Sequence, residues 1–176
     1  MLKRYFFILV LCLFSSSVFL KAEVDSRIRI AILPFFARGE MDKDVTEQIT
    51  ENFTIAMINI NKYSVVERRL LNKVLNELKF QKDDLFDEDT VVEIGKLAGS
   101  QMVVVGTVSE IDYNYFVTVR GIDVKTGVIA FARKENCRKR IDLFPLIDKL
   151  VESIANDRSS TESSDIGNFK NSNKRK

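Results

Sequence analysis

Charged side chains form the two clusters in this sequence of 176 residues that could take part in chemistry. Glu67, Arg68 and Arg69 follow a short β-rich run, and ligands often bind where a strand leaves the sheet of an α/β fold. The segment 83–89 is acidic and could form a calcium loop. We expect a simpler explanation for each cluster. Glu67 to Arg69 would cap the start of a helix and form an ion pair that fixes the strand-to-helix turn. The acidic segment would be a solvated loop at a helix N-terminus.

The groups that most enzymes use are scarce. Histidine, the commonest general base and metal ligand, is absent, and the two cysteines are Cys12 and Cys137. No glycine-rich phosphate loop follows the first expected strand, since residues 33–37 are Leu-Pro-Phe-Phe-Ala. Catalysis would need an acid pair such as Glu67 and Asp123 to meet in a cleft. The sequence therefore predicts a protein with no catalytic residues, no metal and no cofactor.

The first 22 residues have the pattern of a secretory signal peptide. Lys3 and Arg4 precede an uncharged apolar run at 5–20, whose 16 residues fall short of the about 20 that a spanning helix needs. Cleavage after Ala22 is expected, and an uncleaved anchor is the alternative. Cys12 lies within the apolar run after Leu11, which is not typical of a lipidation site. The mature chain would then retain only Cys137, either buried or paired with another chain.

The expected domain spans residues 23–157, followed by a basic tail at 158–176. The tail is rich in Ser, Asn and Lys with few apolar residues, so we expect it to be disordered. The domain itself has 19 basic and 23 acidic residues, a net charge of −4. Nucleic-acid binding is not expected, because it requires a basic face that neutralises phosphates.

The elements that would position these side chains follow from hydrophobic periodicity and turn residues. The predicted order is β-α-β-α-α-β-β-β-α, an α/β (α+β) fold with one mixed five-stranded sheet and helices packed on it. The first half should pair in parallel, and the last three strands should form an antiparallel meander. The expected strands are 27–33, 63–67, 102–111, 115–124 and 128–135, and the expected helices are 44–60, 68–78, 90–97 and 142–154.

Several of these predicted features follow from local signals. Pro34 should end the first strand, and Asp44 with Glu47 resembles a capping box. Asp89 or Thr90 should cap the third helix, and Gly99 should end it. The run Val103 to Val105 should be buried on both faces, Gly127 should allow a tight turn, and Pro145 should fall in the first turn of the last helix.

Four motifs in this order resemble the CsgG-type envelope domain: residues 30–35, 63–68, 94–108 and 123–129. That domain is shared by the curli secretion protein CsgG and the penicillin-binding-protein activator LpoB, and a similar module occurs in the N-terminal part of TolB and in the flagellar outer-membrane protein FlgO. The resemblance covers about 27–153 and implies a periplasmic accessory domain, with association to the outer membrane left open. The short turns at 112–114 and 125–127 leave no room for the membrane hairpins of CsgG, so a secretion channel is not expected.

We therefore expect a non-enzymatic adaptor that docks onto cell-envelope assembly proteins of peptidoglycan synthesis, secretion or motility. The alternative is a periplasmic module that binds a small ligand such as a glycan or nucleotide. Membrane association would be peripheral at most, and oligomerisation stays open. Tyr113, Tyr115 and Phe116 are the candidate partner-binding residues, since they cluster at a turn and aromatic side chains anchor many interfaces. Strand alternation would turn Tyr115 or Phe116 into the core.

Overall fold

A computed structural model of the chain describes residues 25–80 and 87–170, with side chains as far as Asn156. The predicted signal peptide and most of the acidic segment lie outside the described residues. No helix within the described ranges is long and apolar enough to cross a membrane.

The described strands form one mixed sheet in the order β3-β1-β4-β5-β6, and β2 pairs separately with β4. β1 runs parallel to both β3 and β4, whereas β4, β5 and β6 form an antiparallel meander. This confirms the predicted mixed α/β architecture. The strands are β1 (Ile28–Ile32), β2 (Phe36–Gly39), β3 (Tyr63–Val65), β4 (Met102–Ile111), β5 (Asn114–Asp123) and β6 (Ile129–Cys137).

The number of strands differs from the prediction, because β2 lies where we expected a loop. β1 pairs with residues 102–104 and β2 with residues 107–110, so both follow the same edge of β4 with a break between them. Pro34 causes the break, since it has no N–H to donate to a ladder. Leu33 still donates to the Val104 carbonyl at 2.9 Å, and Phe35 donates to the Thr50 hydroxyl at 2.9 Å. The sheet is thus five strands wide but contains six strands.

Two helices begin earlier than predicted, because aspartates further upstream cap them. The Asp42 carboxylate accepts a hydrogen bond from the Asp44 N–H at 2.8 Å, and the Asp87 carboxylate accepts one from the Thr90 N–H at 3.3 Å. Gly99 has a φ of 63° just after α4, as predicted. The helices are α2 (Lys43–Asn59), α3 (Arg68–Glu77), α4 (Glu88–Leu97) and α5 (Leu143–Lys170), with a 3-10 turn at Arg140–Asp142.

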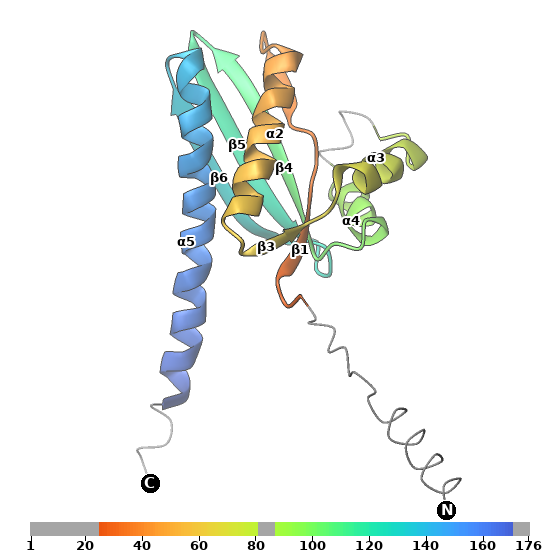
Figure 1. The fold of residues 1–176 in the computed structure, drawn as a ribbon, viewed down its shortest axis with the longest axis vertical. Helices are drawn as coiled ribbons and strands as arrows, with labels where there is room; N and C mark the ends of the chain where they lie inside the picture. The colour runs from red at the N-terminus through yellow and green to blue at the C-terminus, as the bar shows by residue number, and fades with distance from the viewer. Residues whose placement is uncertain (1–24, 81–86, 171–176) are drawn as a thin grey trace, which may run out of the picture.

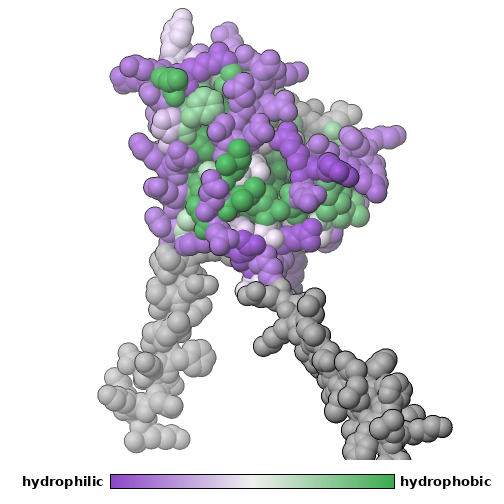
Figure 2. All heavy atoms as spheres, viewed as in Figure 1, coloured by the Kyte–Doolittle hydropathy of each residue, from purple (hydrophilic) through white to green (hydrophobic). Residues whose placement is uncertain are grey.

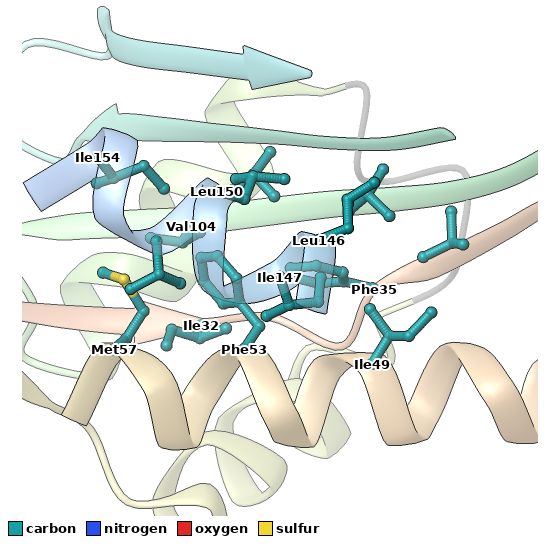
Figure 3. Packing of buried hydrophobic residues seen from close by; sticks show 14 of the residues in the cluster. Ile32, Phe35, Ile49, Phe53, Met57, Val104, Leu146, Ile147, Leu150 and Ile154 are labelled. Atoms are coloured by element: carbon teal, nitrogen blue, oxygen red, sulfur yellow. The ribbon is translucent and has the colours of Figure 1, made fainter. Parts of the chain in front are cut away.

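The helices pack on both faces of the sheet (Figure 1). α2 and α5 lie side by side over one face, and α3 and α4 cover part of the other. The larger core, between the sheet and the α2–α5 pair, includes Phe35, Phe53, Val104 and Leu150 (Figure 3). The middle strand β4 contributes to both cores, and Val103 to Val105 are at most 3% exposed, as predicted.

α5 extends helical backbone to Lys170, well into the tail for which the sequence predicts disorder. Its described side chains contact the larger core as far as Ile154, and Ala155 is also buried. Pro145 lies in the first turn, where the prediction placed it. Disorder of the tail in solution stays a prediction.

Candidate partner-binding surface

Tyr113 occupies the tip of the hairpin that joins β4 to β5. Asp112 and Tyr113 have φ angles of 49° and 59°, which is the left-handed pair that a tight two-residue hairpin requires. The Asn114 side-chain amide donates to the Asp112 carbonyl at 2.9 Å and supports the turn. The Tyr113 side chain has no place in either core and is 86% exposed.

Strand alternation separates the other two candidate aromatics. Tyr115 lies opposite Glu110 and Cys137 and packs against the larger core. Loss of hydration, followed by the charge of Glu110, raises the pKa of Tyr115. Phe116 points to the opposite face, where the Lys134 Nζ lies 4.7 Å from the centre of its ring. The structure therefore leaves Tyr113 exposed, while Phe116 is half-buried on the face away from the larger core and Tyr115 is half-buried against that core.

Phe116 belongs to the part of the sheet that α3 and α4 leave uncovered. We call this the open face; it consists of Thr107, Ser109, Phe116, Thr118, Arg120 and Lys134, all half-buried or exposed. Arg38 on β2 borders it, opposite Ser109. None of the described strand residues whose side chains point to this face is acidic. The open face is thus a flat surface with an aromatic ring and a positive charge.

The cluster at Glu67 to Arg69 lies at the start of α3, and the structure supports its simpler explanation in part. Arg68 Nη2 forms an ion pair with Glu47 Oε1 of α2 at 3.2 Å, and both side chains are largely exposed. Glu67 is the N-cap residue, but its side chain accepts no capping hydrogen bond. The predicted ion pair is therefore confirmed, and the predicted side-chain cap is wrong.

The acid pair of Glu67 and Asp123 does not come together. Val65, Ile30, Met102 and Asp123 form one row across four strands, so three strand spacings, about 14 Å, separate Val65 from Asp123. The Asp123 carboxylate instead accepts hydrogen bonds in the turn after β5.

The remaining candidate groups have structural roles. The Thr90 side chain donates to the Asp87 carboxylate, and this bond is the main cause that lowers the pKa of Asp87. No group of three or more acidic or cysteine side chains in the described parts of the chain could hold a metal ion. Cys137 is half-buried, its Sγ lies 3.4 Å from the Lys139 carbonyl, and burial raises its pKa.

The sheet combines the parallel strands β3, β1 and β4 with an antiparallel meander, and helices pack on both of its faces. These features define the class of the protein as a mixed α/β domain with an open, basic sheet face. The family model of the peptidoglycan-synthase activator LpoB matches residues 42–137, more than half of the chain. The chain therefore belongs to the LpoB family.

Solved structures share this fold. The LpoB C-terminal domain from Escherichia coli is 17% identical, with a TM-score of 0.52 over 64% of this chain and 83% of that chain. Lipoprotein GNA1162 from Neisseria meningitidis is also 17% identical, with a TM-score of 0.57 over 73% of this chain and 97% of that chain. No curated protein sequence matches significantly. The wider grouping with CsgG, TolB and FlgO stays a prediction.

Proposed function

We propose that this chain is an exported, non-enzymatic accessory protein that binds a peptidoglycan synthase of the cell envelope and raises its activity. The observation that carries the proposal is the match of 42–137 to a family described as synthase activators. That matched range includes β3 to β6 and the turn at Tyr113. The proposed location is the periplasm, with peripheral association to the outer membrane. Loss of residues 1–22 from protein recovered from the envelope, measured by intact mass, tests the export step.

The proposed contact surface is the open face together with the turn at Tyr113. Tyr113 is freely accessible, and Phe116 can bury its outer ring face against a partner. Large aromatic side chains and arginine supply much of the binding energy of protein interfaces. Arg38, Arg120 and Lys134 give the surface a positive charge, so the matching surface of the synthase should be acidic.

The test is binding to a purified bifunctional penicillin-binding protein of the same organism, measured by calorimetry, together with its rate of glycan-strand synthesis. The double variant Tyr113→Ala, Phe116→Ala should bind at least tenfold more weakly and lose activation, since hot-spot aromatics each contribute roughly 2 kcal/mol. Its melting temperature should not change. Phe144→Ala is the matched control, because Phe144 is an accessible aromatic on α5, the helix that packs on the other face of the sheet.

Two results would count against the proposal. Full binding by the double variant would place the interface elsewhere on the domain. A wild-type protein that neither binds nor activates the synthase would contradict the function itself.

A further inference from the structure

The parallel part of the sheet contains a crevice of the kind in which α/β folds bind ligands. β1 lies between β3 and β4 and runs parallel to both. The chain runs from β1 through β2 to α2 on one face of the sheet, and from β3 to α3 on the other. Where two neighbouring strands send their connections to opposite faces, a crevice opens at their C-terminal ends.

A cavity of about 410 Å³ lies in this crevice. The segment that joins β1 to α2 passes between α2 and α3 in Figure 1, and Figure 2 shows apolar surface in the middle of the same view, bordered by hydrophilic side chains. A smaller hollow of about 30 Å³ shares Pro34 and Arg68 with the cavity and reaches Val65 at the end of β3. The larger volume is within the range of small-molecule sites.

The inner wall of the cavity is apolar in character, although two threonines line it. The Thr46 hydroxyl donates to the Asp42 carbonyl at 2.8 Å, and the Thr50 hydroxyl donates to the Thr46 carbonyl at 2.9 Å. The Phe35 N–H completes the hydrogen bonding of Thr50. Both threonines are 2% exposed and already satisfied, so together with the phenyl rings of Phe35 and Phe36 they offer an apolar wall.

The rim of the cavity is positively charged. Lys43 and Arg68 face a single acidic lining residue, Glu47, which pairs with Arg68. Among the described residues, no hydrogen bond or ion pair engages the Lys43 side chain, and the neighbouring Asp42 carboxylate pairs with Arg140 instead. The first turn of α3, which begins at Arg68, carries no acidic side chain, and the carboxylate of the N-cap residue Glu67 accepts no hydrogen bond from the helix.

We propose that this crevice binds a small molecule with an apolar, ring-sized body and one anionic group, a carboxylate or a phosphate monoester. The apolar part of the ligand packs against Phe35 and Phe36. Its anionic group lies between Lys43 and Arg68, where it competes with Glu47 for the Arg68 guanidinium. The site shares no residue with the proposed synthase contact, which uses the open face and Tyr113, although Phe36 of the cavity pairs with Thr107 of the open face. Through this site a small molecule could bind to a domain whose family is described as synthase activators.

The test titrates the full protein with three probes that share one fluorophenyl ring: 4-fluorophenyl phosphate, 4-fluorobenzoate and the neutral 4-fluorobenzyl alcohol. Fluorine and amide NMR report binding and location. The two anions should shift amides of residues 35–37, 43–50 and 68–70, and the alcohol should bind at least tenfold more weakly. Arg68→Gln should weaken anion binding about tenfold, because it removes a charge-assisted hydrogen bond.

Arg69→Gln is the matched control, since it removes the same charge at the next position of α3 but does not line the cavity. The double variant Tyr113→Ala, Phe116→Ala should bind the anions normally, which separates this site from the synthase contact. Equal binding of the alcohol, equal losses at Arg68 and Arg69, or amide shifts confined to other regions would each overturn the proposal.

Discussion

The ring of Phe35 lies directly against the backbone of Gly106. A Cβ atom built at position 106 would come within 2.5 Å of two ring carbons of Phe35. The ring cannot easily give way, because it is 5% exposed and packs on Phe53 with ring centres 5.1 Å apart. Phe35 also donates its N–H to Thr50 at the break between β1 and β2. Gly106 thus allows the segment between β1 and β2 to approach β4 closely.

Gly106→Ala should lower the free energy of unfolding by about 1–3 kcal/mol, the usual cost of forcing extra volume into a packed core. Chemical denaturation measures the loss. Gly121→Ala is the matched control on the neighbouring strand: its Cβ would meet the ring of Phe131, which is only half-buried and can turn outward. An equal loss at both positions would mean that Phe35 is not held as described.

Val104→Asp should unfold the domain or come close to it. Val104 is 0% exposed in the middle of the sheet, paired with Ile32 on one side and Gly121 on the other. An unpaired carboxylate there should cost several kcal/mol, comparable to the whole stability of a small domain. Ser109→Asp, on the open face of the same strand, should cost less than about 1 kcal/mol. A Val104→Asp protein with an unchanged melting midpoint would contradict the assignment of β4.

Asp123 should make stability depend on pH in the acidic range. Its carboxylate accepts bonds from the Thr126 N–H at 2.8 Å, the Thr126 hydroxyl at 2.9 Å and the Lys125 N–H at 3.0 Å. The bonds from Thr126 are the main cause that lowers the pKa of Asp123 in the folded protein. A lowered pKa stabilises the fold fully above the unfolded value of about 4, and this contribution disappears as the pH falls through the folded value.

Asp123→Asn keeps an acceptor oxygen but cannot titrate. The free-energy advantage of the wild type over Asp123→Asn should therefore be present at pH 7 and shrink below about pH 4, as measured by urea unfolding across pH. Asp123→Ala should cost about 1 kcal/mol at pH 7, since it removes all the accepted bonds. A wild-type advantage that grows toward low pH would contradict this account.

The helical segment from Arg158 to Lys170 should exchange its amide protons nearly as fast as an unfolded chain. It follows the last buried residues of α5, and a short helix rich in Ser is marginal without packing. Residues 143–155 of the same helix should be protected, which provides an internal control. Protection beyond residue 158 in the free protein would show that the tail has a docking site.

Hydrophobic periodicity was sufficient to predict most of the fold. The continuous run around Val104 identified a strand buried on both faces, and Gly127 marked the turn of the meander. The strand β2 was missed because its four residues include Arg38 and Gly39 and begin two residues after Pro34. Its pairing depends on the long edge that β4 offers, which no local pattern reveals. The helix starts were misplaced by up to two residues because several aspartates compete as caps.

The candidate surfaces were predictable only in part. Strand alternation could have grouped Phe116, Thr118 and Arg120 on one face, since they are two residues apart. What the sequence could not show is that α3 and α4 are too short to cover that face. The cavity beside Arg68 likewise depends on α2 and α3 lying on opposite faces of the sheet. The sequence around Lys43, Thr46 and Thr50 therefore did not indicate that these residues line a cavity.

The parallel pairing of β1 also orders events during folding. β4, β5 and β6 are joined by short turns and can pair soon after they are made, whereas β1 finds its first partner, β3, about 35 residues further along the chain and its second partner, β4, about 70 residues further. A ribosome that makes the chain from its N-terminus therefore releases β1 long before β4. One edge of β1 can therefore pair with β3 early, while its other edge stays unpaired until β4 has been made.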